Sequence, residues 1–221
     1  MAKGEPTARL ARERGLSRTQ LHTLRQRLQG NLNTTAPTDV MRGTAFEADE
    51  LYHKAGKKSP PPPDPTDPPR RRAHKRKGRG TYANDRPPIS SIISRDTGEQ
   101  RWWGCDHADR QTCRTLMADH VPPGSTLLYP DEWQSYRGSH PCHAPVSHGV
   151  REWARDDNGD GQREVHCDTC EGAGAALRTD LRTFRGVHKQ SLPLYIATYE
   201  AMVNAKRVTP ALIQRMCVGD L

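Results

Sequence analysis

A proline-rich and basic interruption in the first half of the chain most constrains its fold. Seven of the ten residues from Pro60 to Pro69 are proline. Proline lacks the backbone N–H that a sheet ladder or a helix interior needs, so this stretch is expected to be extended and to lie outside any central strand. Seven of the next ten residues, 70–79, are lysine or arginine. We therefore expect an insertion over residues 57–86, with a solvated proline half and a basic half that follows phosphate groups.

The charge of the whole chain favours an anionic partner. The formal net charge is +8, the pI is about 9.4 and the mean hydropathy is −0.91. Nucleic acid is the expected partner, and a ribosomal or nonspecifically adhesive basic protein is the alternative. The insertion side chains expected to contact DNA phosphates are Arg70, Arg71, Arg72, Lys75, Arg76 and Lys77.

The apolar residues give no indication of a membrane segment. No stretch approaches the roughly 18 consecutive apolar residues that a spanning helix needs, and the N-terminus lacks the apolar region of a signal peptide. We expect a cytoplasmic, nucleoid-associated protein. The six cysteines are sparse, which in such a compartment argues against a disulfide framework.

The N-terminal residues have the pattern of two short helices joined by a tight turn. We expect the first helix over Thr7–Arg14 and a turn at Gly15. The second helix opens with a capping box of Ser17 and Gln20, and Gly30 is expected to end it. Its expected apolar stripe is Leu21, Leu24 and Leu28, and the arginines expected to face outward toward DNA are Arg18, Arg25 and Arg27.

These two helices predict a helix-turn-helix DNA-binding segment over residues 1–32, followed by a linker over 33–43. An ordinary basic helical hairpin is the alternative. Two short helices bury little surface, so a third has to come from elsewhere in the chain.

The rest of the sequence predicts strands first and helices last. Strands are expected over residues 43–52, 88–94, 100–105 and 125–129, with a further strand region over 145–150 and its candidate partner 163–167. Helices are expected over residues 111–120, 171–182, 192–206 and 210–216. We assign residues 44–206 to one domain and 207–221 to a C-terminal tail.

Three acidic residues lie at characteristic points of this order. Asp49 lies in the first expected strand, Asp131 directly follows the fourth, and Glu171 lies in the first turn of the next helix. The order is that of an α/β ribonuclease-H-like fold, a mixed five-stranded sheet with flanking helices whose first and fourth strands are neighbours. That topology would bring the three carboxylates together. Carboxylate oxygens suit Mg²⁺, and two ions about 4 Å apart can clamp the attacking and leaving oxygens of a phosphodiester.

Sequence blocks around these acids carry a resemblance to a known family. The blocks are Asp49-Glu50, Asp131-Glu132-Trp133-Gln134-Ser135-Tyr136, His166-x-Asp168-Thr169-x-Glu171, Arg178, Phe184-Arg185-Gly186 and the closing helix from Leu194 to Asn204. Together they resemble bacterial insertion-sequence transposases of the DDE superfamily, in the branch where a zinc ribbon and a helix-turn-helix precede a short integrase-like domain. The resemblance covers most of residues 7–206.

The resemblance implies a role for each matched residue. Asp49, Asp131 and Glu171 would hold two Mg²⁺ ions, which Mn²⁺ could replace. His166 would orient the scissile phosphate, and Arg178 would contact DNA phosphate.

Three features depart from the pattern of that family. Asp168 stands where Asn is usual, which adds a negative charge near the expected metals and leaves open whether Asp168 or Glu171 is the third acid. Arg178 stands where Lys is usual and keeps the charge with a different geometry. The sequence also contains no zinc ribbon before the helix-turn-helix.

The resemblance implies a DNA transposase, truncated or degenerate, that cuts insertion-sequence ends and joins them to target DNA. Its expected partners are double-stranded DNA and further copies of itself. Two alternatives remain open: a non-catalytic helix-turn-helix remnant that binds element ends, and a ribonuclease-H-like nuclease.

Two other patterns concern metals. Cys167 and Cys170 have the spacing of half a structural zinc site. Its other ligands would be Cys142 with His140 or His143. The acidic stretch 156–161 resembles the start of a calcium-binding loop, but its twelfth position is a cysteine instead of glutamate, so we interpret it as a surface turn.

Overall fold

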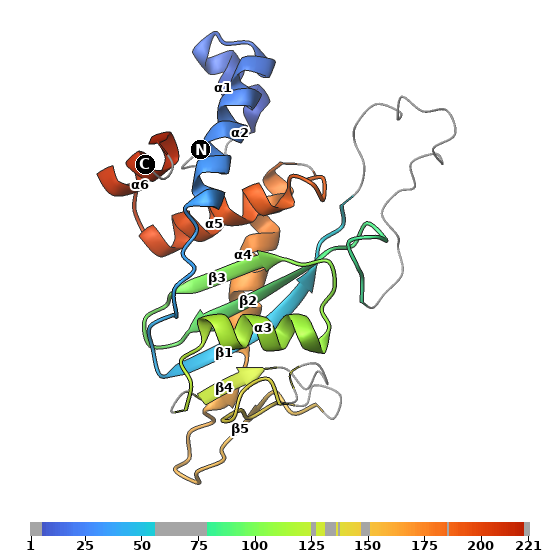
Figure 1. Ribbon diagram of the computed structural model, residues 1–221, viewed down its shortest axis with the longest axis vertical. Helices are drawn as coiled ribbons and strands as arrows, with labels where there is room; N and C mark the ends of the chain where they lie inside the picture. Colours follow the sequence, from blue (N-terminus) through green and yellow to red (C-terminus); the bar gives the residue numbers. More distant parts are fainter. Residues whose placement is uncertain are drawn as a thin grey trace. The chain divides into compact units, whose positions relative to one another are not determined.

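The computed structural model (Figure 1) describes residues 6–55, 79–124, 127–130, 136, 138–146, 151–184 and 186–218. It divides into two compact units. The first unit comprises Met1–Ala36, Tyr52–Pro88 and Leu177–Leu221, and the second comprises Pro37–Leu51 and Ile89–Ala176. In the described part of the chain, no helix is long and apolar enough to cross a membrane.

The first unit is helical and begins with the expected helical pair. Helix α1 is Thr7–Arg14, and Gly15 ends it in the left-handed conformation, with φ of 64°. Helix α2 is Arg18–Thr34. The Ser17 hydroxyl accepts a 3.1 Å hydrogen bond from the Gln20 amide, and the Gln20 side chain accepts a 3.2 Å bond from the Ser17 amide. The predicted capping box is therefore confirmed.

Helix α2 continues past Gly30, which was expected to end it. Leu32 is 1% exposed and packs against Ala201 and Leu212. Asn31 donates a 2.8 Å hydrogen bond to the carbonyl of Met216. These contacts extend α2 because tertiary packing outweighs the modest helix penalty of one glycine.

Helices α5 (Leu192–Ala205) and α6 (Pro210–Val218) supply the packing partners that the N-terminal pair needs. Both contact α2 within the first unit. The Arg215 guanidinium also donates a 2.8 Å hydrogen bond to the Thr35 carbonyl. The third helix of the N-terminal bundle thus comes from the far end of the sequence.

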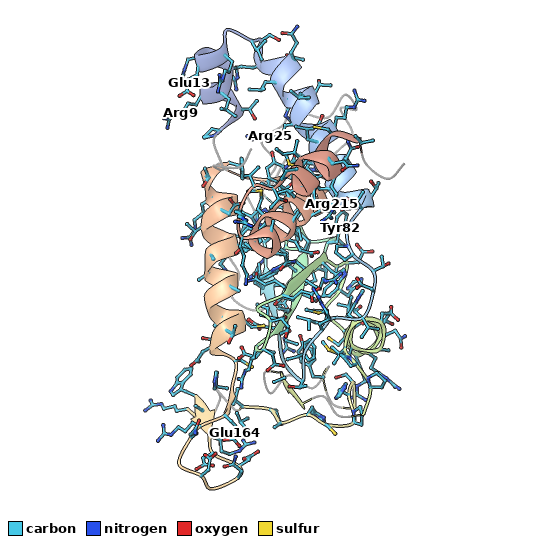
Figure 2. The ribbon with its side chains drawn as sticks, turned by 90° about the vertical axis from the view of Figure 1, so that its left-hand side faces the viewer. Arg9, Glu13, Arg25, Tyr82, Glu164 and Arg215 are labelled. Atoms are coloured by element: carbon cyan, nitrogen blue, oxygen red, sulfur yellow. The ribbon has the colours of Figure 1, made fainter. Side chains whose placement is uncertain are left out.

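The buried face of α2 differs from the expected stripe. Leu24 is 48% exposed, whereas Arg25 is 4% exposed. The Arg25 guanidinium carbon lies 5.0 Å from the centre of the Phe184 ring, within cation–π distance. Figure 2 labels Arg25 among the side chains of the chain. The expectation that Arg25 faces outward toward DNA is therefore wrong, because α2 turns that position toward the helices that cover it.

The second unit is built on a mixed sheet. Its strands are β1 (Ala45–Tyr52), β2 (Pro88–Ser94), β3 (Gln100–Gly104) and β4 (Leu127–Pro130). Their order is β3-β2-β1-β4, with β2 and β3 antiparallel and β1 and β4 parallel. The expected neighbourhood of the first and fourth strands is confirmed.

The fifth strand of the expected sheet is not found among the described residues. Strands β5 (Ala154–Arg155) and β6 (Val165–His166) instead pair with each other in a separate two-stranded sheet. Each contributes only two residues, which is too short to extend a sheet of longer strands. Residues 147–150, where a further strand was expected, lie outside the described residues.

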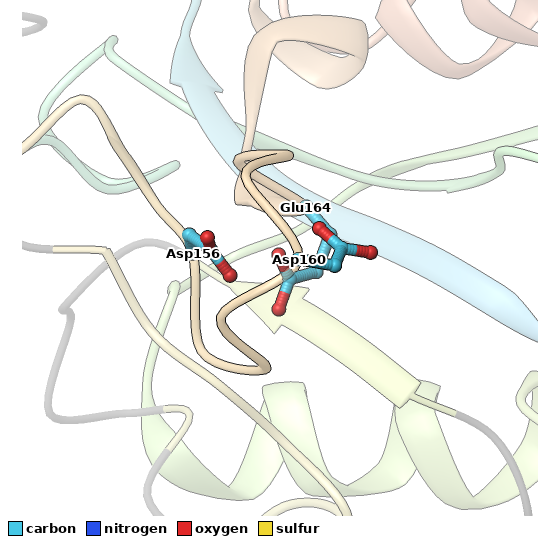
Figure 3. Close-up of side chains that lie close together, drawn as sticks. All are labelled: Asp156, Asp160 and Glu164. Carbon is cyan, nitrogen blue, oxygen red and sulfur yellow. The ribbon is translucent and has the colours of Figure 1, made fainter.

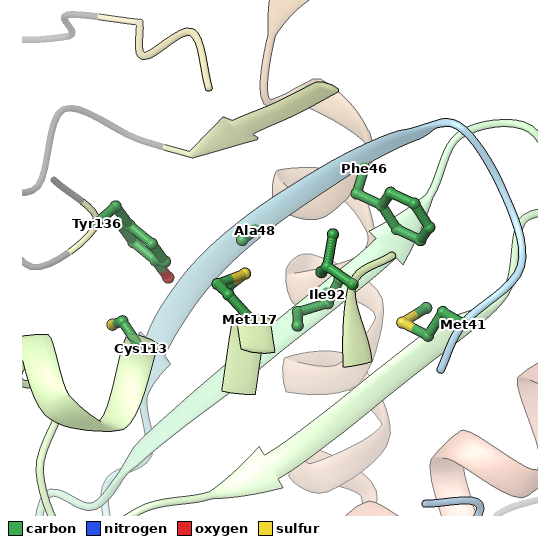
Figure 4. Close-up of a cluster of buried hydrophobic side chains, with 8 residues drawn as sticks. Met41, Phe46, Ala48, Ile92, Cys113, Met117 and Tyr136 are labelled. Carbon is green, nitrogen blue, oxygen red and sulfur yellow. The ribbon is translucent and has the colours of Figure 1, made fainter. Parts of the chain in front are cut away.

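Helices lie on both faces of the larger sheet. Helix α3 (Arg110–His120) lies on one face, and α4 (Asp168–Thr183) passes behind the other (Figure 1). Side chains alternate between the two faces of a strand. On the α3 side, Phe46 and Ala48 of β1 join a buried cluster with Ile92, Cys113, Met117 and Tyr136 (Figure 4).

The expected insertion falls largely on residues 56–78, which lie outside the described residues together with its prolines and its basic cluster. The residues that flank this stretch contact one another. The Ala55 amide donates a 3.1 Å hydrogen bond to the Asp85 carbonyl. Lys189 forms a 2.9 Å ion pair with Asp85 and lies 4.6 Å from the centre of the Tyr82 ring.

Candidate active site

A set of buried polar contacts in the second unit surrounds Glu47, an acid that the sequence analysis did not assign to the site. Its side chain is fully buried, with 0% exposure, in strand β1. Oε1 accepts hydrogen bonds from Arg95 Nε at 2.6 Å and from Thr169 Oγ1 at 2.8 Å, and Oε2 accepts one from the Cys170 amide at 2.9 Å. Both oxygens are thus engaged by the protein, so Glu47 is a poor candidate for a metal ligand.

Arg95 connects Glu47 to the segment before α4. Its two terminal nitrogens donate 2.6 Å hydrogen bonds to the carbonyls of Glu164 and His166. The guanidinium therefore neutralises the buried carboxylate and fixes β6 at the same time. No local sequence signal indicates this contact, because Phe46 and Ala48 point to the opposite face of the strand and their burial does not predict that of Glu47.

Asp49 lies two residues beyond Glu47, on the same face of β1. Its carbonyl accepts a 3.1 Å hydrogen bond from Ser91 Oγ, and its Oδ1 accepts a 2.7 Å bond from the Glu50 amide. Burial and then the carboxylates of Asp49 and Glu47 raise the pKa of the Cys170 thiol. Asp49 is therefore close to the first turn of α4, as a shared site would require.

Glu171 lies in that first turn and is exposed. Its backbone amide donates a 3.0 Å hydrogen bond to the Cys167 carbonyl. Asp168 opens the helix, and its side chain is 76% exposed. The His166 Nδ1 atom accepts a 3.4 Å bond from the Asp168 amide and lies 3.7 Å from Glu47 Oε1.

Asp131 lies outside the described residues, but the strand that leads to it is described. In the parallel pairing of β1 with β4, Ala45 is paired with Leu127 and Ala48 with Pro130. An aspartate follows each of the last two partners in the sequence: Asp49 follows Ala48, and Asp131 follows Pro130.

Tyr136 returns the chain to β1 shortly after Asp131. The Tyr136 hydroxyl donates a 3.1 Å hydrogen bond to Glu50 Oε2, and its ring is buried in the core. Burial and the neighbouring Glu50 carboxylate raise the pKa of this phenol. Glu50 thus holds Tyr136, while Glu47 holds the first turn of α4.

The expected DNA-contacting residues fall into three groups. Arg18 and Arg27 are exposed on α2, and Arg178 is exposed on α4. Arg25 is buried. The six basic side chains expected from the insertion lie outside the described residues.

A second acidic group lies on the loop between β5 and β6. Ligand atoms of Asp156, Asp160 and Glu164 lie within 4.8 Å of one another (Figure 3), so this group could hold a metal ion. The loop is also closed internally, because Asp156 accepts bonds from the amides of Gly159 and Gly161 at 2.6 and 2.9 Å. The sequence analysis identified the first two of these acids as part of a surface turn and missed Glu164.

The cysteines do not form the zinc site that their spacing suggested. Cys167 and Cys170 are buried, Cys142 is exposed, and all three are free thiols. Where the structure describes the chain, the one grouping of three potential metal ligands is the acidic group on the β5–β6 loop.

No protein-family model matches the chain. It is 33% identical, over 169 residues, to an uncharacterised protein in the transposable element ISH50 of Halobacterium salinarum. The chain is related to a transposable-element protein. The similarity covers 75% of the chain and 53% of the relative, so the chain spans about half the length of the curated protein that it matches.

One solved structure with a detectable likeness is a cryo-EM structure of the simian T-cell lymphotropic virus intasome in complex with the PP2A regulatory subunit B56 gamma. The likeness covers 98% of this chain and 72% of that chain, with a TM-score of 0.42 and 9% sequence identity.

Proposed function

We propose that the chain is a DNA transposase of the DDE type, with a ribonuclease-H-like second unit and a helix-turn-helix in the first. The observation that carries the proposal is the parallel register of β1 and β4, which ends one residue before Asp49 and one before Asp131. Contacts from Glu47 to the first turn of α4 bring the Glu171 segment to the same strand. The relative in a transposable element supports the same function.

The proposed site residues are Asp49, Asp131 and Glu171. Their donors are carboxylate oxygens alone, a set that fits Mg²⁺ better than zinc. A Mg²⁺ pair held by these three carboxylates would supply a stronger nucleophile and would stabilise the leaving oxygen. His166 would orient the scissile phosphate.

The proposed DNA surface of the first unit includes Arg18 and Arg27 of α2. Their exposed guanidinium groups would neutralise phosphates and release counterions. Further proposed contacts come from Arg178 on α4 and from the basic part of the insertion. Assembly of several copies on the element ends is part of the proposal.

The test is a cleavage and strand-transfer assay on duplex DNA that carries the inverted repeats flanking the gene. We expect Mg²⁺-dependent nicking at the repeat ends and joining to target DNA. Asp49→Asn should abolish both, whereas the matched control Asp156→Asn, on the β5–β6 loop, should retain both.

The assay also separates the alternatives. Binding of the repeats without cleavage would identify a non-catalytic DNA-binding remnant. Cleavage that ignores the repeats would identify a nuclease. Loss of activity in Asp156→Asn with retention in Asp49→Asn would move the site to the β5–β6 loop.

A further inference from the structure

We infer that Glu47 is a positioning residue that fixes the first turn of α4 on β1, and thereby sets the separation of Asp49 and Glu171. This inference deepens the proposed function and rests on it for the catalytic consequence. The contacts themselves lie entirely within the second unit.

The geometry of Glu47 links the two acids over very short chain segments. On β1, Glu47 and Asp49 are two residues apart and share one face. On α4, the Glu47 partners Thr169 and Cys170 directly precede Glu171. Loss of either contact is therefore expected to change the position of Glu171 relative to Asp49, because no flexible segment separates the acids from Glu47 and its partners.

The two contacts on α4 constrain different parts of its first turn. The bond from the Cys170 amide satisfies one of the four N–H groups that a helix leaves without a partner at its start. The bond from Thr169 Oγ1 fixes the rotation of the same turn. A carboxylate at this place also interacts favourably with the positive end of the helix dipole.

The burial of Glu47 argues for a role in specifying geometry. An ion pair inside a protein is often no more stabilising than packed apolar side chains of similar volume, because both charges lose their hydration. Glu47 is fully buried, and the side chain of its partner Arg95 is 17% exposed. A valine or leucine would fill this place in a strand, but it would not define the distance from β1 to α4.

Thr169→Val is the sharpest test, because valine has nearly the same shape and lacks only the hydroxyl that bonds Glu47. Thr169→Ser keeps the hydroxyl and is the matched control. Glu47→Gln is the second variant, although it leaves Arg95 without its carboxylate and is expected to be less stable.

The first measurement uses Fe²⁺ with ascorbate as the probe, because iron at a magnesium site cleaves the nearby polypeptide. In the parent we expect cleavage near Asp49 and near Glu171. In Thr169→Val we expect cleavage near Glu171 to fall about tenfold, the factor for one lost charge-assisted hydrogen bond, with cleavage near Asp49 retained. Thr169→Ser should restore the parent pattern.

The second measurement is the kinetics of DNA cleavage. We expect Thr169→Val to lower kcat about tenfold with KM for DNA unchanged, because the DNA contacts remain, and Tm should fall only by the effect of one lost hydrogen bond. Parent-like iron cleavage and parent-like kcat in Thr169→Val would overturn the inference. A fall in activity that follows a fall in Tm, without rescue by Thr169→Ser, would also overturn it.

The third measurement separates failure of the inference from failure of the proposed function. Hydrogen exchange at the Cys170 amide should accelerate in Glu47→Gln and Thr169→Val, with the later turns of α4 unchanged. If the parent shows no iron cleavage near either acid, the proposed function fails, whereas an unchanged Cys170 exchange rate refutes the positioning role directly.

Discussion

Ala48 of β1 is the parallel partner of Pro130 of β4, and an aspartate follows each of them in the chain. Neighbouring strands lie about 4.8 Å apart, so paired residues of parallel strands are within reach of one metal pair. This register is the reason that we propose one site for Asp49 and Asp131.

Asp168→Asn is expected to keep Mg²⁺-dependent cleavage of end-containing duplex at the parent level or above it. Asp168 lies one turn before Glu171 on α4, so its carboxylate adds negative charge near the substrate phosphate. Asparagine keeps the shape and removes that charge. The assay compares the parent with the Asn and Ala variants, and loss of cleavage in both would make Asp168 the third acid in place of Glu171.

Truncation of Arg25 is expected to change the stability of the fold, whereas truncation of Arg27 is expected to change DNA binding. Arg25→Ala should lower the free energy of unfolding by about 1–3 kcal/mol, because it removes a buried side chain that packs on Phe184. Arg27→Ala should leave stability unchanged and reduce the salt dependence of DNA binding by about one phosphate contact. Urea denaturation and binding titrations at several salt concentrations measure the two effects. A stable Arg25→Ala variant with weakened DNA binding would contradict the buried position.

Tyr136→Phe is expected to lower the free energy of unfolding by about 1–3 kcal/mol. The change leaves the buried ring in place, removes the hydroxyl that donates to Glu50, and leaves that carboxylate without this donor. Tyr82→Phe is the control, since Lys189 contacts the Tyr82 ring and carbonyl, which both remain. Equal unfolding midpoints for Tyr136→Phe and the parent would show that the Glu50 contact does not hold the segment after β4.

Asp180→Asn is expected to raise Tm at neutral pH and to flatten its pH dependence. Burial raises the pKa of the Asp180 carboxyl, although the nearby Arg25 opposes the shift. The folded state therefore binds this proton more tightly than the unfolded state. The free energy of unfolding therefore falls as the pH rises from the ordinary pKa of aspartate through the raised pKa of Asp180. Above the raised pKa, the cost of the buried charge remains. Thermal melts across that range measure the effect, and a lower Tm for Asp180→Asn at neutral pH would show that pairing with Arg25 outweighs burial.

Gly30→Ala is expected to stabilise the protein by about 0.5–1 kcal/mol, because Gly30 lies inside α2 and a Cβ atom there would meet nothing within 4 Å. Gly15→Ala should destabilise it, because Gly15 has φ of 64° although the space around it is equally open. The pair separates backbone conformation from steric contact. Denaturant unfolding of both variants is the measurement, and a destabilised Gly30→Ala protein would argue that α2 does not continue past this residue in solution.

Much of the secondary structure followed from local rules in the sequence. The capping box at Ser17, the hairpin of β2 and β3, and the helices α3 to α6 were all predictable, because each depends on residues a few positions apart. The chain order of strands also predicted that β1 and β4 are neighbours. The positions of Asp49 in β1 and of Glu171 in the first turn of α4 followed on the same basis.

Contacts between distant residues were decided only by the tertiary structure. Glu47, Arg95 and Thr169 meet although they are far apart in the sequence, and no local pattern connects them. The burial of Arg25 and the length of α2 likewise depend on helices from the other end of the chain. Hydrophobic periodicity and capping fix where an element forms, because the relevant energies act within a few residues. Which face is buried, and which charge meets which, depends on packing of the whole unit, so the sequence determined the elements and the tertiary structure determined the Glu47 contact that joins β1 to α4.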